Sequence, residues 1–177
     1  MSADKLQTKL GDYLEDTHAL ETNVLQMLGS MIATTDDAQI RGELERHREQ
    51  TEEHERRLRG RLEAIGRSPS LRKEAQTIIT GLLKGVADQV RGDKAGKNAR
   101  DAYVTEHMEI AAYELLERLA ERAGDRETAE LARRHKREEQ EMAAKIAANW
   151  DRSIELTLAE AGIEAGTPQG GADVQPT

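Results

Sequence analysis

Ionisable side chains occupy positions in this sequence where the apolar stripe of a helix should carry hydrophobic ones. In one segment the stripe is interrupted by His47, Thr51 and His54. At about 100° per residue, both histidines point to the side of the helix that the neighbouring leucines define. Imidazole and carboxylate groups are donors that suit iron or manganese, and neither metal needs a thiolate. The pattern therefore favours a metal site or a polar network in the middle of the folded chain.

The same interruption recurs in three other amphipathic segments. Glu21 lies within the stripe of the first segment, Glu109 within that of the third, and His135 at the centre of that of the fourth. Further acidic residues flank these stripes, namely Glu106, Glu138 and Glu139. Every long segment therefore contributes ionisable groups near its middle.

Several buried carboxylates need a neutralising partner. An unpaired buried carboxylate costs several kcal/mol or more, whereas a domain of this size has about 5 to 15 kcal/mol of net stability. Internal Glu–His ion pairs are one solution, and two divalent cations shared by carboxylates and bound by imidazoles are the other. For a single histidine the internal pair is the commoner outcome. The joint pattern over four segments favours the metals.

A spacing repeat supports the joint interpretation. Glu21 and His47 are 26 positions apart (47 − 21), and Glu109 and His135 are also 26 positions apart (135 − 109). The two halves of the chain match at an offset of 88 positions (109 − 21). Each half then offers a Glu from its first helix and a His from its second, which predicts a pseudo-two-fold pair of metal positions.

The composition predicts that helices carry these groups. Charged residues make up 34% of the 177 positions, aromatic residues make up 2%, and Phe is absent. This balance favours helix over strand. Long helices are predicted over about 4–33, from Thr35 or Asp36 as N-cap to near Gly66, over about 98–122, and from about 127 to at least 150 and as far as 161.

The remaining segments complete the predicted fold. A shorter helix is expected between 70 and 90, followed by a loop through Gly92, Gly96 and Lys97. The fold class is all-α: a ferritin-like four-helix bundle of two antiparallel hairpins with a long crossover that carries the short helix. Residues 1–161 would form this bundle. Residues 162–177 are rich in Gly, Pro, Gln, Ala and Thr, and they are expected to be a disordered tail.

Other classes of function find little support. Cysteine is absent, which excludes disulfides, Fe–S clusters and a cysteine nucleophile. The net charge of −8 and the lack of a basic cluster argue against nucleic acid and anionic membranes as partners. The loop before position 98 lacks the glycine spacing and the Ser or Thr of a phosphate-binding loop. Without a leader or a long apolar run, a cytoplasmic protein is expected.

Over about residues 5 to 150 the sequence resembles the bacterial ferritin-like stress proteins typified by YciE and YciF. The resemblance rests on the segments Tyr13–Glu21, His47–Thr51 with His54, Glu106–Tyr113, and the pair Glu138 and Glu139. In that family, as in the similar rubrerythrins, the resemblance implies a two-metal centre, usually described as di-iron. Carried over to this chain, it indicates the ligands Glu21, His54, Glu106, Glu109 and Glu139.

Two positions depart from the family pattern. Gln50 and Ala143 stand where the family commonly has acidic residues. His47 and His135 are the replacements that the wheel positions indicate, and they would make the site more neutral and richer in nitrogen. The full set of candidate metal ligands is Glu21, His47, His54, Glu106, Glu109, His135 and Glu139.

The resulting hypothesis is a cytoplasmic, dimetal-binding bundle that holds two Fe ions, or alternatively two Mn ions, and reacts with oxygen or peroxide in stress defence. A ferroxidase or a peroxide-scavenging activity would fit this chemistry, and a homodimer is the expected assembly. One alternative is a metal-free interaction or dimerisation protein in which the polar core fixes the helix register. Another is iron storage in a hollow shell.

Overall fold

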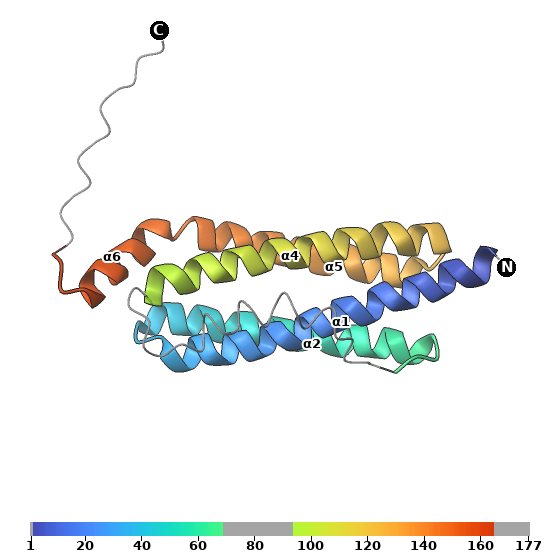
Figure 1. Ribbon diagram of the computed structural model, residues 1–177, viewed down its shortest axis with the longest axis horizontal. Helices are drawn as coiled ribbons and strands as arrows, with labels where there is room; N and C mark the ends of the chain where they lie inside the picture. Colours follow the sequence, from blue (N-terminus) through green and yellow to red (C-terminus); the bar gives the residue numbers. More distant parts are fainter. Residues whose placement is uncertain (1, 69–93, 165–177) are drawn as a thin grey trace, which may run out of the picture.

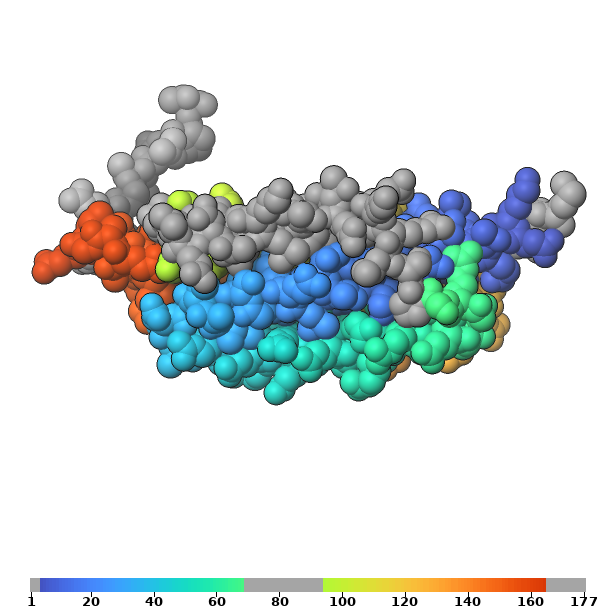
Figure 2. Space-filling view, turned by 60° about the horizontal axis from the view of Figure 1, so that its bottom comes forward, coloured from blue at the N-terminus to red at the C-terminus, as the bar shows by residue number. Residues whose placement is uncertain are grey.

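The computed structural model describes residues 2–68 and 94–164, and within this part of the chain five α-helices form (Figure 1). They are α1 (Ser2–Thr34), α2 (Ala38–Ala64), α4 (Lys94–Ala123), α5 (Arg126–Ala147) and α6 (Trp150–Glu160). α1 and α2 form one antiparallel hairpin, and α4 and α5 form the other. The predicted all-α bundle of two hairpins is confirmed. Figure 2 shows α1 and α2 side by side along one face of the molecule, with α6 at one end.

Two sequence predictions lie outside the described residues. One is the short helix expected between 70 and 90, with the start of the loop that follows it. The other is the tail, of which only the residues up to 164 are described. None of the helices in the two described ranges has an apolar stretch long enough to cross a lipid bilayer.

Side-chain caps set the turns of both hairpins. Asp37 caps α2, and its carboxylate accepts hydrogen bonds from the backbone N–H groups of Gln39 and Ile40. The prediction of Thr35 or Asp36 as the cap was therefore wrong by one or two residues, because only from Asp37 does the carboxylate reach the free N–H groups of the first turn. In the other hairpin Gly124 has a φ of 73°, and Asp125 caps α5 by accepting a hydrogen bond from the backbone N–H of Thr128.

α4 begins four residues earlier than predicted, so Gly96 and Lys97 are helical rather than part of a loop. The reason is an interaction with α6. The backbone N–H of Lys94 donates to Glu160 at 2.8 Å, and that of Gly96 donates to Thr157 Oγ1 at 2.9 Å. Because side chains from α6 satisfy N–H groups that the first turn leaves free, the helix extends toward its N-terminus.

The predicted fourth helix is broken into α5 and α6 at Ala148 and Asn149. The side-chain amide of Asn149 donates to the carbonyl of Lys145 at 2.8 Å, which competes with the helical backbone bond at that point. Asn149 has φ −113° and ψ 17°, outside the helical range. The break turns α6 away from the line of α5 and places it against α4 (Figure 1).

Two apolar clusters fill the described core. One contains Leu10, Leu14, Leu58, Leu62 and Leu116, and the other contains Leu20, Val24, Met27, Leu28 and Met31. The buried stripe of α4 runs through Leu116, and the adjacent Leu115 is 53% exposed. In α1, Glu21 lies between Leu14 of one cluster and Leu28 of the other.

Candidate metal centre

All seven candidate ligands are buried. Their exposed fractions are 0% for Glu21, Glu109, His135 and Glu139, 1% for His54 and Glu106, and 3% for His47. α1 supplies one of them, and α2, α4 and α5 supply two each. Each helix presents them on its core-facing stripe, as the sequence predicted, and Glu106, expected on the flank, is as buried as the others.

His54 lies between two carboxylates of different helices. Its Nδ1 atom is 2.7 Å from Glu139 Oε1 and 3.4 Å from Glu21 Oε1. One ligand atom from each of the three residues lies within 4.8 Å of the others. This group, from α1, α2 and α5, is the first place where a cation fits.

A second group of the same kind adjoins the first. His47 Nε2 lies 3.0 Å from Glu106 Oε1, and Glu139 completes the set of three ligand atoms within 4.8 Å of one another. Glu139 therefore belongs to both groups. A carboxylate shared by two adjacent three-residue groups is the arrangement that two neighbouring cations need.

On its outer side His54 contacts Glu138, which was not among the metal ligands predicted from the sequence. His54 Nε2 lies 2.6 Å from Glu138 Oε2, and the Glu138 side chain is 33% exposed. Glu138 and Glu139, adjacent in sequence, thus contact opposite nitrogens of one imidazole. The sequence could have indicated this contact, because Glu138 and Glu139 lie on either side of the apolar stripe of α5. Glu138, His54 and His135 also form a third group whose ligand atoms lie within 4.8 Å of one another.

Tyr113 joins His135 to Glu21. The buried Tyr113 hydroxyl donates to Glu21 Oε1, and His135 Nδ1 lies 3.1 Å from the same hydroxyl. Because the hydroxyl hydrogen is used toward Glu21, His135 Nδ1 must be the donor in the second bond. The Nε2 atom of His135 is then left with its lone pair. The hydroxyl of Tyr113 thereby orients both neighbours.

The repeat predicted that each hairpin offers a Glu and a His to the core, and it left open which of these residues contact each other. His47 pairs with Glu106, and His54 takes the place next to Glu21. The 88-position repeat therefore placed the right residue types in the core but did not identify the partners. His18, 88 positions before Glu106, belongs to none of these groups, and its Nε2 lies 2.8 Å from Glu55 Oε1.

The buried side-chain nitrogen and oxygen atoms that lack a hydrogen-bond partner are concentrated in this cluster. Within residues 2–68 and 94–164 there are ten such atoms, and all ten belong to the seven candidate ligands. They are Oε2 of Glu21, both ring nitrogens of His47, Nδ1 of His54, Oε2 of Glu106, both oxygens of Glu109, Nε2 of His135 and both oxygens of Glu139. Several lie close to another polar atom, but at angles unsuited to a hydrogen bond. Unmade hydrogen bonds in the core are costly, and most of these residues belong to the groups whose ligand atoms lie within 4.8 Å of one another.

Three of the four buried carboxylates of the cluster are short of compensating charge; in the fourth, Glu139, the contact with His54 outweighs burial and lowers the pKa. Burial raises the pKa of Glu109 well above its usual range, and the neighbouring Glu139 and Glu21 raise it further. Burial likewise raises the pKa of Glu21, and that of Glu106 to about 7. These raised pKa values mean that the metal-free core favours bound protons, and divalent cations would neutralise the same carboxylates.

The two central histidines have opposite preferences for the proton. Burial alone would lower the pKa of His54, but its contacts with Glu139 and Glu21 outweigh this and raise it to about 10. Burial, together with the positive charge of His54, lowers the pKa of His135 to about 2. His135 is therefore a neutral imidazole with a free Nε2 lone pair at physiological pH, the form in which histidine binds a metal.

Comparisons with known proteins agree with this fold. The model of a family described as "Domain of unknown function (DUF892)" matches residues 5–159. A solved protein of Xanthomonas campestris pv. campestris is similar in structure, with a TM-score of 0.75 and 23% identity over 89% of this chain and 99% of that one. The Escherichia coli stress protein YciF has a TM-score of 0.62 and 19% identity, over 89% of this chain and 97% of that one.

The fold also resembles a bacterioferritin of Desulfovibrio desulfuricans, whose structure is described with a diiron site. The TM-score is 0.71 at 17% identity, over 99% of this chain and 98% of that one. At these identities the matches establish the fold. They confirm the ferritin-like bundle and the resemblance to the YciF group.

Proposed function

The chain belongs to the DUF892 family, and from this premise we propose that it binds two divalent transition-metal ions, iron or alternatively manganese, in the core of its four-helix bundle. One observation carries the proposal: every buried side-chain nitrogen or oxygen without a hydrogen-bond partner, among the residues described, belongs to the seven residues that the sequence singled out. A polar core evolved for structure alone would satisfy these groups among themselves.

The residues would divide between two positions. Glu21 and His54 would serve one metal, His47 and Glu106 the other, and Glu139 both. Glu109, with neither carboxylate oxygen hydrogen-bonded, would bind at the same centre, and so would His135 through Nε2. Oxygen and imidazole donors without thiolate favour iron or manganese. Two such ions sharing a carboxylate supply two-electron chemistry with oxygen or peroxide.

The protein's own groups prepare these ligands. Glu138 accepts from His54 Nε2, so the proton that a metal would displace is the one on Nδ1, in the manner of the carboxylate–histidine–metal arrangements of other proteins. Tyr113 holds Glu21 and His135 together and keeps its own proton, because burial raises the pKa of its phenol well above 10. The complete burial of the carboxylates keeps bulk water away from them.

The reaction we propose is oxidation of bound iron by oxygen or peroxide, as ferroxidase or peroxide-scavenging chemistry in stress defence. The described diiron site of the bacterioferritin supports iron, and the description of YciF as a stress protein supports the physiological role. A cytoplasmic homodimer is part of the proposal. Light scattering during size-exclusion chromatography distinguishes such a dimer from a hollow storage shell.

The direct test is metal analysis combined with ferrous titration. Protein prepared without added metal is loaded with Fe(II) under anaerobic conditions and then exposed to oxygen or peroxide, with binding and oxidation followed optically. We expect about two irons per chain. The variants Glu21→Ala and Glu109→Ala should lose bound iron and keep their helicity, whereas the surface variant Glu130→Ala should behave like the parent. Iron binding by either core variant at the parental level would overturn the ligand assignment. Absence of binding by the parent would favour the metal-free interaction protein.

A further inference from the structure

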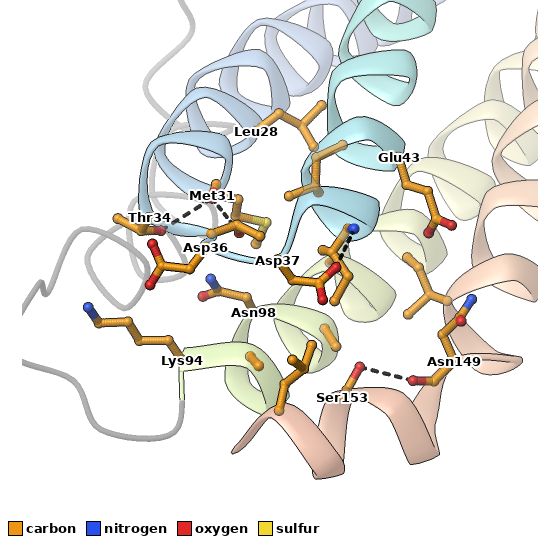
Figure 3. Close-up of a pocket in the computed structure, with 18 of the residues that line it drawn as sticks. Leu28, Met31, Thr34, Asp36, Asp37, Glu43, Lys94, Asn98, Asn149 and Ser153 are labelled. Atoms are coloured by element: carbon orange, nitrogen blue, oxygen red, sulfur yellow. Dashed lines mark hydrogen bonds between the residues drawn. The ribbon is translucent and has the colours of Figure 1, made fainter. Parts of the chain in front are cut away.

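A cavity of about 230 Å³ lies at the end of the bundle where the α1–α2 turn, the start of α4 and α6 meet (Figure 3). Its walls are largely apolar, and α1, α2, α4 and α5 all contribute to them. Apolar wall residues are Leu28, Met31, Leu44, Ala102, Met142 and Ile146. An apolar space of this size lowers stability unless something fills it. A closely packed protein therefore has reason to keep it only for an occupant.

The inner end of the cavity reaches the candidate metal centre. His47 and Glu106 both line it, although only 3% and 1% of their surfaces are exposed. His47 Nδ1 and Glu106 Oε2 are among the buried atoms without a hydrogen-bond partner. The cavity is thus apolar along its walls and ends on two unsatisfied polar side chains.

The outer end is polar and predominantly acidic. Asp36, Asp37, Glu43 and Glu160 line the cavity, whereas Lys94 is its only Lys or Arg among the residues described. Asp36, Asp37 and Lys94 lie around the same opening, near Asn98 at the start of α4 (Figure 3). Asp37 is paired with Arg152 at 2.8 Å, but Asp36, Glu43 and Glu160 still outnumber Lys94, so an anionic head group would meet net repulsion here. The charges therefore disfavour a fatty-acid carboxylate and favour an uncharged molecule.

The dimensions suit a small organic molecule. An apolar cavity of about 150 Å³ in another protein binds benzene, so the larger space here has room for a longer aliphatic molecule. Asn98 and Glu106 line its opposite ends and are eight residues apart on α4, roughly 12 Å at a rise of 1.5 Å per residue. The flexible side chains of Met31 and Met142 can adapt to a ligand.

We propose that this cavity binds a small neutral apolar organic molecule, with an extended aliphatic chain along the walls and one end against His47 and Glu106. The binding itself does not depend on metal. Only the position of the ligand beside a metal centre rests on the proposed function.

Octanol and octanoate test the proposal, because they have equal chain lengths and differ in charge. Each is titrated into the metal-free protein by calorimetry and by ligand-observed NMR. We expect one octanol per chain, with octanoate binding at least tenfold more weakly. Octanoate binding as tightly as octanol, or octanol binding without saturation, would refute the proposal.

Cavity-filling variants locate the site. Ala102→Leu and Ala99→Leu each add volume at the wall, and each should weaken octanol binding at least tenfold without loss of helicity. Ala111→Leu is the matched control, since Ala111 lies on the exposed side of the same helix and does not line the cavity. If both wall variants fold and bind octanol like the parent, the ligand is not in this cavity.

A metal-loaded sample separates the two proposals. Octanol should alter the EPR spectrum of protein loaded with Mn(II), and Ala102→Leu should remove this change. If octanol binds but the spectrum stays the same, the placement of the ligand beside the centre is wrong. If no metal binds while octanol still does, the proposed function fails and the apolar ligand site stands.

Discussion

The rings of His54 and His135 stack in the core, with centroids 3.9 Å apart and planes inclined by 17°. The first comes from α2 and the second from α5, so the contact joins the two hairpins. Two protonated imidazoles at this distance would repel each other strongly. The carboxylates that contact His54 decide which ring holds the proton, and His135 remains neutral.

The stack predicts two unusual histidine titrations in the metal-free protein. His54 should stay protonated up to about pH 10, and His135 should stay neutral down to the pH at which the protein unfolds, because its pKa is lowered to about 2. NMR spectra of histidine-labelled protein between pH 5 and 9 would show two ring signals that do not shift. Titration of either residue near pH 6.5 would contradict the assignment.

Glu106 should make the metal-free protein less stable as pH rises. Its pKa is raised from 4.5 to about 7 in the folded state, so between these values the folded protein holds a proton that the unfolded chain has lost. The stabilisation is complete below about pH 4.5 and is lost as pH rises through 7. Relative to the parent, Glu106→Gln should gain of the order of 1–3 kcal/mol over this window.

Urea unfolding at several pH values measures this difference. Glu130→Gln is the control, since Glu130 is exposed on α5, and its stability should follow that of the parent at every pH. A constant difference between parent and Glu106→Gln from pH 4.5 to 7 would show that Glu106 has an ordinary pKa.

Metal binding should release protons. His54 holds a proton up to about pH 10, and a metal at Nδ1 must compete with it. Affinity for Mn(II) should therefore rise between pH 6 and 8, by up to tenfold per pH unit for each proton displaced. Calorimetry at pH 7 in two buffers of different ionisation enthalpy gives the number of protons directly. An affinity that does not change from pH 6 to 8 would exclude ligation by His54, since neutral His135 has no proton to release in this range.

Glu138 should affect metal affinity without affecting the fold. Glu138→Ala removes the acceptor that orients His54, and the expected loss of affinity is about 10- to 100-fold. Glu138→Gln retains an acceptor oxygen and should therefore keep most of the metal affinity that Glu138→Ala loses. Glu141→Ala, at an exposed position of the same helix, is the control. A merely structural role would lower the melting temperature of Glu138→Ala and leave its affinity unchanged.

Tyr113→Phe should destabilise the metal-free protein. The substitution leaves Glu21 Oε1 and His135 Nδ1 without the hydroxyl in a fully buried site, which costs about 1–3 kcal/mol. Tyr103→Phe is a suitable control, because Tyr103 contacts His107 and Trp150 through its ring, which Phe retains. Equal stabilities of the two variants in urea unfolding would argue against the hydrogen-bonded chain.

The periodicity of the sequence was enough to place the ionisable groups in the core. Glu21 and Glu109 are fully buried because they lie on stripes that are otherwise apolar, and burying a stripe buries every residue on it. The helical composition likewise predicted the turn of one hairpin closely, since the predicted helix ends at about 122 and 127 lie within one residue of those observed. These are properties of single helices, which local sequence encodes.

The partners within the core depended on the tertiary structure. The rotation and axial shift of α2 against α1 decide whether His54 or His47 lies next to Glu21. The spacing of residues along the sequence does not encode this rotation or this shift. The same holds for Glu138 on the outer nitrogen of His54, for the capping of α4 by α6, and for the cavity that ends on His47 and Glu106. Each arises from side chains of different helices meeting in space, and so only the packed bundle determines it.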